Sequence, residues 1–218
     1  MNGRAAVRFG GISGILYVVL FIPAYVVGYP DAPTSTSNGF EYFNAGQTAF
    51  LFFNGILPIF AVFFFLWFLG ILHGLLRRAE GEGVGLSSAA LAGGVMFATL
   101  AWAGVAVEIS HPATLARFAN FQQNAQLVFL SLALSSWLYH FCQIGTAVLV
   151  SATSLMALRT NILPAWLAWV GFVIALFALL HFLIPLIGSA AGLLWVAVVS
   201  VLMLIGPVVP PPAAHSGR

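Results

Sequence analysis

Long apolar stretches dominate the sequence and decide what the chain can fold into. A helix of about 20 mainly apolar residues crosses the hydrocarbon core of a bilayer. Six stretches meet or approach that length: residues 9–28, 48–75, 86–108, 127–157, 163–186 and 190–206. Backbone amides in lipid must be paired within their own segment, which favours helices. We therefore predict an all-α, polytopic transmembrane bundle of six helices over residues 1–206, followed by a Pro-rich cytoplasmic tail at 207–218.

The composition argues against a soluble globular domain. Hydrophobic residues make up 61% of the 218 residues and charged residues only 6%, whereas soluble domains carry about 25% charge. A globule of this size cannot hide so much apolar surface. We expect the lipid bilayer to be the main partner, with other membrane-protein subunits or a homo-oligomer as protein partners. The net charge of +2 rests on few residues and gives no reason to expect nucleic acid.

The arginines predict how the chain is oriented. Arginine-bearing loops tend to remain in the cytoplasm. With the N-terminus inside, only Arg117 lies outside, and an even number of spans places both termini in the cytoplasm. The six arginines that would lie inside are Arg4, Arg8, Arg77, Arg78, Arg159 and Arg218. The span at 9–28 is longer than a signal-peptide core of about 7–15 residues, so we expect it to be retained. Lysine is absent while Ala, Gly, Val and Leu are abundant, which suggests a bacterial source, so the predicted location is a bacterial plasma (inner) membrane.

Small residues mark the helix faces that we expect to pack. In lipid, helices associate through small side chains that allow backbones to approach closely. One such face runs along the span at 86–108 and leads outward to Glu108. Its members are Ala90, Gly94, Ala98 and Ala101. Two shorter motifs of the form Gly-x-x-x-Gly occur in the first and last spans, at Gly10–Gly14 and Gly188–Gly192.

Polar residues form a stripe along the span at 127–157. The stripe consists of Ser136, His140, Gln143, Ala147, Ser151 and Ser154. Polar side chains are costly in contact with acyl chains, so we expect this stripe to face the interior of the bundle. His140 and Gln143 then lie near the middle of the membrane.

Five residues form a candidate functional polar cluster, because polar and ionisable side chains inside a membrane often mark function. They are Glu108, His111, His140, Gln143 and His181. Glu108-x-x-His111 has the spacing of two metal ligands on one helical face, although Pro112 disfavours a helix at His111. A metal site with His181 and a hydrogen-bonded cluster are the two alternatives. We assign no metal and no catalytic residue.

Haem binding is disfavoured by the depths of the histidines. The best pair, His140 and His181, is expected to differ in depth by about 8–10 Å on the helix rise. His73 is expected at the cytoplasmic interface. The sequence has no phosphate-binding loop, zinc-protease motif or dinucleotide fingerprint. We therefore assign no cofactor and expect a protein that is not an enzyme.

Three segments resemble an uncharacterised family of six-span bacterial membrane proteins of the actinobacterial type. They are RAAVRFGGISGILYVV at the start, LRTNILPAWLAWVGFVIAL between the fourth and fifth spans, and the closing LLWVAVVSVLMLIG. The resemblance implies a six-span fold and a plasma-membrane location. It implies no activity and no site residues.

The predicted function is a non-enzymatic accessory or structural subunit, or a small binding module, of a bacterial membrane complex. One alternative is a transporter or transporter subunit with a polar route along the fourth span, which requires a water-accessible cavity that reaches His140 and Gln143. The other is a membrane-embedded metal or enzyme site near the outer face, built on Glu108, His111 and His181.

Overall fold

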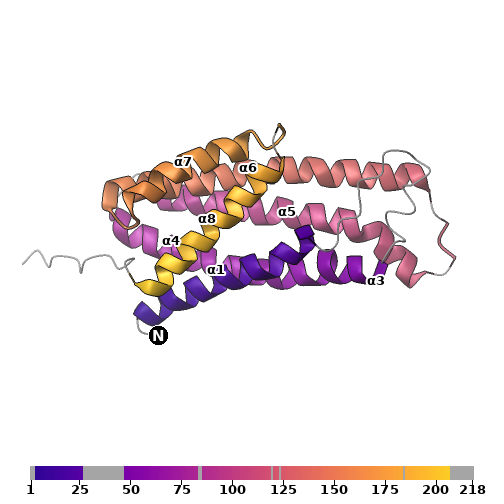
Figure 1. Cartoon of the computed structure of the whole chain (residues 1–218), viewed down its shortest axis with the longest axis horizontal. Coiled ribbons are helices and arrows are strands. Elements are labelled where there is room, and N and C mark those ends of the chain that lie inside the picture. The colour runs from indigo at the N-terminus through magenta and orange to yellow at the C-terminus, as the bar shows by residue number, and fades with distance from the viewer. Residues whose placement is uncertain are drawn as a thin grey trace, which may run out of the picture.

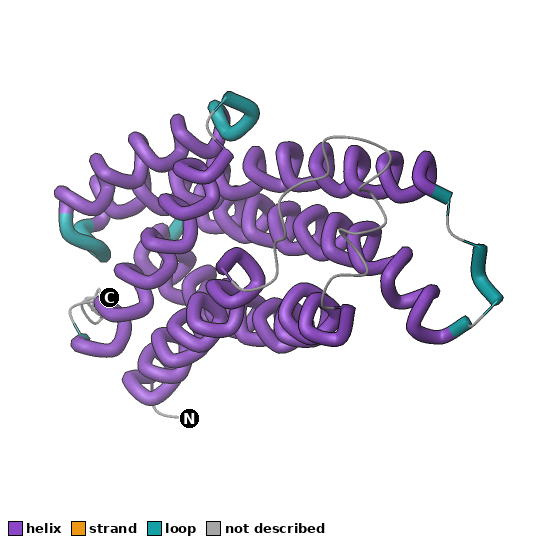
Figure 2. Tube along the Cα trace, turned by 45° about the vertical axis from the view of Figure 1, so that its right-hand side comes forward, coloured by secondary structure: helices purple, strands orange, loops and turns teal. Residues whose placement is uncertain are grey.

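The regular elements of the described chain are all helices. The computed structural model describes residues 3–26, 47–82, 85–118, 120–122, 124–183 and 185–206. Its elements are α1 (Gly3–Val26), α3 (Gln47–Phe50), the π-helical turn η1 (Leu51–Ile56), α4 (Leu57–Glu80), α5 (Leu86–Arg117), α6 (Ala125–Thr160), α7 (Ala165–Leu179) and α8 (Pro185–Ile205). Because α3, η1 and α4 are continuous, these elements form six helical segments. Figure 2 shows how the helices lie together in the bundle. The tail at 207–218 lies outside the described residues.

The helices are those of a membrane protein. Five of them are long and apolar enough to cross a bilayer, and α7 is a shorter apolar helix. The most extensive packing is between α5 and α6, followed by α1 with α4, α6 with α7, and α1 with α8. Figure 1 shows α7 returning along α6 and α8 running back to the beginning of α1. The chain therefore closes into one bundle whose first and last helices are neighbours.

The fifth predicted span has the wrong bounds. The segment predicted at 163–186 is a helix of 15 residues, α7, which is about 22 Å long and shorter than a bilayer core of about 30 Å. A hydrogen-bonded turn follows, with His181 N donating to Ala178 O and Leu183 N donating to Leu180 O. The next helix begins at Pro185, not at 190. The turn was missed because its own residues are mostly apolar and resemble a helix interior in composition.

The third predicted span is too short. We expected it to end near Glu108, with Pro112 disfavouring a helix at His111, but α5 continues through Pro112 to Arg117. Proline is tolerated inside membrane helices because neighbouring groups satisfy the backbone around it. Thr114 Oγ1 donates to Ser110 O at 2.8 Å in this stretch. At 32 and 36 residues, α5 and α6 are about 48 and 54 Å long and exceed the bilayer core.

The small-residue faces pack as predicted. A Cβ on Gly14 would meet Ser200 of α8 and Phe68 of α4, so α1 approaches both helices closely. The predicted face of α5 is buried, and its Gly94 lies against Leu69 of α4. A second contact was not predicted. Gly93 of α5 faces Gly145 of α6, where an added Cβ would meet backbone atoms at 2.5–2.8 Å.

The turn between α4 and α5 is held by side chains. The Glu80 carboxylate accepts hydrogen bonds from the backbone N–H groups of Leu86 and Ser87 and from the Ser87 hydroxyl. These bonds satisfy N–H groups that the first turn of α5 leaves unpaired. Nδ1 of His73 lies 3.0 Å from the carbonyl oxygen of Ser87, so His73 joins α4 to the same turn.

Five of the six described arginines gather at one end of the bundle. Figure 1 places the start of α1, the α4–α5 turn and the α6–α7 turn at the same end, whereas α5 ends in Arg117 at the opposite one. The arginines at the first end are Arg4, Arg8, Arg77, Arg78 and Arg159. This segregation agrees with the predicted charge asymmetry between the two membrane faces.

Candidate functional site

Two histidines meet where α6 packs against the end of α7. Nδ1 of His140, in α6, lies 2.9 Å from Nδ1 of His181, in the turn after α7. Their ring centroids are 5.1 Å apart. His181 is 5% exposed and His140 is half-buried. At this distance one Nδ1–H donates a hydrogen bond and the other Nδ1 accepts it.

The predicted difference in depth between these histidines is therefore wrong. That prediction placed the outer ends of the two spans at the same depth, whereas α6 has 36 residues and α7 only 15. The shared turn between α6 and α7 gives a better reference. His140 precedes its centre by about 22 residues and His181 follows it by about 18, which leaves them within about 6 Å along the helix axes. Counting from the turn would have identified the pair.

The pair continues into a third polar side chain. Nε2 of His181 lies 3.0 Å from Oγ of Ser189, near the start of α8. Each group in the chain His140–His181–Ser189 can donate or accept, depending on the histidine tautomers. The chain is therefore a hydrogen-bonded path that crosses from α6 to α8. Ser189 was missed in the sequence, where its only signal is its position between the two glycines of Gly188–Gly192.

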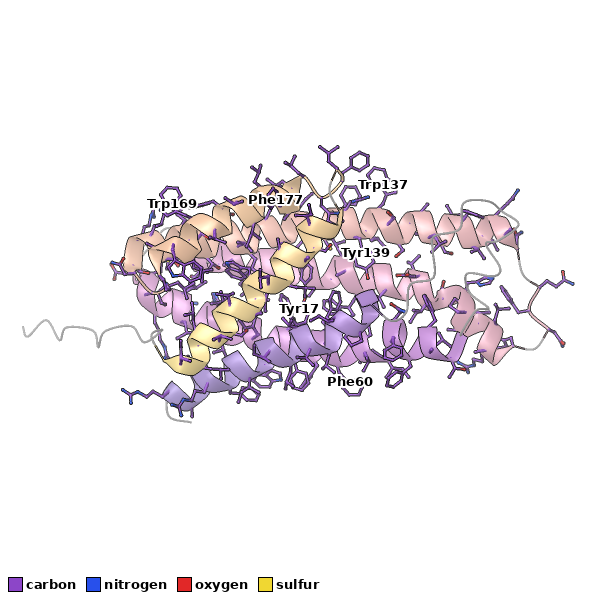
Figure 3. All side chains as sticks on the ribbon, viewed as in Figure 1. Tyr17, Phe60, Trp137, Tyr139, Trp169 and Phe177 are labelled. Atoms are coloured by element: carbon purple, nitrogen blue, oxygen red, sulfur yellow. The ribbon has the colours of Figure 1, made fainter. Side chains whose placement is uncertain are left out.

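Ser189 also lines an internal cavity. The cavity measures about 30 Å³, which is room for one or two water molecules. Its other polar wall residues are Gln143 and Thr146 of α6. Most of the wall is apolar and aromatic, with Tyr17 and Trp195 among its members. Figure 3 shows Tyr17 on α1 within the bundle. A polar chain thus ends at a small cavity whose wall includes polar side chains of α6 and α8.

Gln143 faces the interior, as predicted. It is 3% exposed, and its Nε2 donates to Sγ of Cys142 at 3.7 Å. Ala147 and Ser154 are buried too, whereas Ser136 is exposed. The prediction for Ser136 was therefore wrong. Near its N-terminal end α6 extends beyond α7 and α8 (Figure 1), so fewer helices cover this part of the stripe.

Aromatic rings surround the outer side of the histidine pair. The His140 ring lies 5.6 Å from that of Trp137 and 5.4 Å from that of Phe182. Both aromatic side chains are more than half exposed. Figure 3 shows Trp137 beside the turn that joins α7 to α8. His140 therefore stands between the surface of the bundle and the buried His181.

Glu108 and His111 do not belong to the chain of hydrogen bonds through His140, His181 and Ser189. Both are buried on α5, and the His111 ring packs edge-on against Phe121 at 5.8 Å. Among the described residues, no three His, Cys, Asp or Glu side chains come together in a way that could hold a metal ion. The alternative of a metal site built on Glu108, His111 and His181 is therefore not supported by the described residues. His181 is paired with His140 instead.

The comparisons with known proteins add no family. No family model, no curated protein and no solved structure matches this chain. The resemblance to a six-span bacterial family stays a prediction. The functional argument rests on the geometry of His140, His181 and Ser189 beside the cavity.

Proposed function

We propose that the protein is a non-enzymatic proton-exchanging module of the bacterial plasma membrane, acting as a transporter or as a subunit of one. The observation that carries the proposal is the contact at 2.9 Å between the Nδ1 atoms of His140 and His181. Proton routes through membranes use chains of titratable side chains that face the bundle interior. In the proposed orientation both termini are cytoplasmic, and His140 lies in the outer half of the membrane.

The proposed transfer moves one proton along three groups. A proton arriving at Nε2 of His140 releases the Nδ1 proton of that ring to Nδ1 of His181. The His181 imidazolium then gives its Nε2 proton to Oγ of Ser189, whose own hydroxyl proton passes to water in the cavity. No bond other than those to hydrogen changes, and one proton enters for each that leaves. Histidine suits this role because its ordinary pKa lies near neutrality.

Proton flux into liposomes tests the proposal. The purified protein is reconstituted into phosphatidylethanolamine and phosphatidylglycerol vesicles that contain a pH-sensitive dye, and a potassium diffusion potential drives the protons. We expect flux above that of protein-free vesicles. His140→Gln and His181→Gln should each reduce the flux to background, because glutamine cannot exchange a ring proton.

The matched control is His73→Gln, a change of the same type in α4, beside the α4–α5 turn. Glutamine retains a donor for Ser87 O, so wild-type flux is expected. Flux equal to that of empty vesicles in the wild type, or unchanged in His181→Gln, rules out the proposal. The accessory role predicted from the sequence then remains, with the histidine pair serving to join the end of α7 to α6.

Cysteine accessibility gives an independent test. Cys142 is the only cysteine and is buried, so a Cys142→Ala background accepts single cysteines at positions 140 and 143. A water-soluble thiol reagent should modify at least one of them from one side of the membrane. If both positions stay unmodified from both sides, no aqueous route reaches the pair.

A further inference from the structure

A second pocket lies at the arginine-bearing end of the bundle and contains neither histidine of the pair. It is formed where α1 begins and α8 ends, and its volume is about 210 Å³. One water molecule needs only about 10–15 Å³ by the same kind of measure. The lining residues are Arg4, Val7, Arg8, Met203, Ile205 and Gly206. The pocket therefore has room for a group much larger than water.

The charge of this pocket is positive. Arg4 and Arg8 are four residues apart on α1, which places them on one face of the helix. Among the described residues, no acidic side chain lines the pocket, and neither guanidinium forms an ion pair with an acidic residue. The start of α1 and the end of α8 carry partial charges of opposite sign that oppose each other. The two guanidinium groups thus dominate the electrostatics of the pocket.

The remaining wall is apolar. Val7 and Met203 are buried, and Ile205 is 70% exposed at the last turn of α8. Guanidinium groups bind phosphate oxygens in a bidentate manner. A free phosphate ion would use the arginines but gain nothing from the apolar wall. A phospholipid presents a phosphate that is joined to hydrocarbon, so it matches both parts of the lining.

We propose that the pocket formed by Arg4, Arg8 and the end of α8 binds the phosphate headgroup of an anionic phospholipid. The site is independent of the proton-exchange proposal, since it shares no residue with the histidine pair or its cavity. The bound lipid joins the first and last helices of the bundle at the membrane surface. Each arginine is expected to contribute about fivefold to lipid affinity.

Native mass spectrometry of the intact protein tests this site. The protein is released from detergent micelles that contain either phosphatidylglycerol or phosphatidylcholine. We expect one retained phosphatidylglycerol and preferential loss of phosphatidylcholine. The double variant Arg4→Gln/Arg8→Gln should weaken retention by about twenty-fold or more. The matched control, Arg77→Gln/Arg78→Gln, removes the same charge at the same end and should retain the lipid.

A second variant avoids dependence on the arginines. Ile205→Glu places a negative charge at an exposed position of the pocket, where folding is not expected to suffer, and should also release phosphatidylglycerol. Circular dichroism and size-exclusion chromatography verify that each variant is folded. Equal losses in the two arginine double variants, unchanged retention in Ile205→Glu, or displacement of the lipid by millimolar inorganic phosphate would each overturn the proposal.

Discussion

At the scale of single residues, the histidine pair explains how polar groups are accommodated in an apolar bundle. A buried polar side chain without a partner is costly, and in lipid the surroundings offer no water to compensate. His181 satisfies both ring nitrogens, one with His140 and one with Ser189. The same bonds that remove this cost create a path for protons, so structural and functional roles coincide in these three side chains.

The first prediction at this scale concerns Ser189. Ser189→Ala removes the partner of His181 Nε2 but leaves the contact between the histidines. Proton flux should fall by up to about tenfold, since one hydrogen bond contributes about 0.5–1.5 kcal/mol. Vesicle flux measures the change, and Ser151→Ala, at a half-buried serine of α6, serves as the control. Wild-type flux in Ser189→Ala would exclude Ser189 from the path.

The second prediction at this scale concerns the α4–α5 turn. Glu80→Gln removes the charge that accepts bonds from Leu86 and Ser87, so the melting temperature of the protein should decrease. Glu82, two residues further along the chain, is exposed. Glu82→Gln removes an equal charge and should have little effect on the melting temperature. Thermal denaturation in detergent compares the two variants. Equal melting temperatures would mean that the carboxylate does not cap α5.

The candidate site was only partly predictable from individual residues. Gln143 faces the interior because a polar amide avoids lipid, and the stripe made this visible in the sequence. The contact of His140 with His181 depends on where α7 stops, which apolar composition does not reveal. Glu108 and His111 have the spacing of a ligand pair, yet spacing within one helix does not determine which other helix supplies the third group.

At the scale of elements, the contact between α5 and α6 depends on glycine. Gly93 and Gly145 face each other, and the Cβ of any other residue would meet backbone atoms that cannot rotate away. Gly94 differs, because a Cβ there meets the flexible side chain of Leu69. The predicted small-residue face thus identifies the side of α5 that packs on α4, and the neighbouring glycine identifies the side that packs on α6.

The prediction for this contact uses the smallest possible change. Gly145→Ala should destabilise the bundle by about 1–3 kcal/mol, the usual range for overpacking a close contact. Gly70→Ala is the matched control, since nothing lies within 4 Å of a Cβ at that helical position. Thermal melting in detergent should therefore separate the variants. A smaller effect at Gly145 than at Gly70 would contradict the backbone contact.

Element boundaries were the least predictable part of the fold. Pro112 lies inside α5 because a membrane helix can continue through proline when the surrounding groups compensate. Pro185, in contrast, coincides with the start of α8, where its missing N–H costs little. The same residue type therefore continues one helix and begins another, and only packing against the remaining helices distinguishes the two cases.

At the scale of the whole molecule, the sequence predicted the number of helical segments and the grouping of arginines. Both follow from the lipid bilayer, because apolar stretches enter its hydrocarbon core and guanidinium groups stay outside it. The unequal lengths could not be predicted in the same way. The long α5 and α6 extend past α7 and α8, and this mismatch sets which part of α6 is covered.

The prediction at this scale is that the two ends of the bundle lie on opposite sides of the membrane. In the Cys142→Ala background, a cysteine at exposed Gln122 should react with an impermeant thiol reagent in intact cells. A cysteine at exposed Glu82 should react only after the membrane is permeabilised. Reaction of both positions from the same side would contradict the bundle's passage across the membrane.

The most direct measurement is a nitrogen–nitrogen correlation across the histidine hydrogen bond, recorded by NMR on ¹⁵N-histidine-labelled protein in lipid bilayers. A shared proton between His140 and His181 predicts a cross-peak between two Nδ1 resonances. That cross-peak should vanish in His181→Gln and persist in His73→Gln. Two histidines that give no correlation and titrate independently of each other would contradict the account.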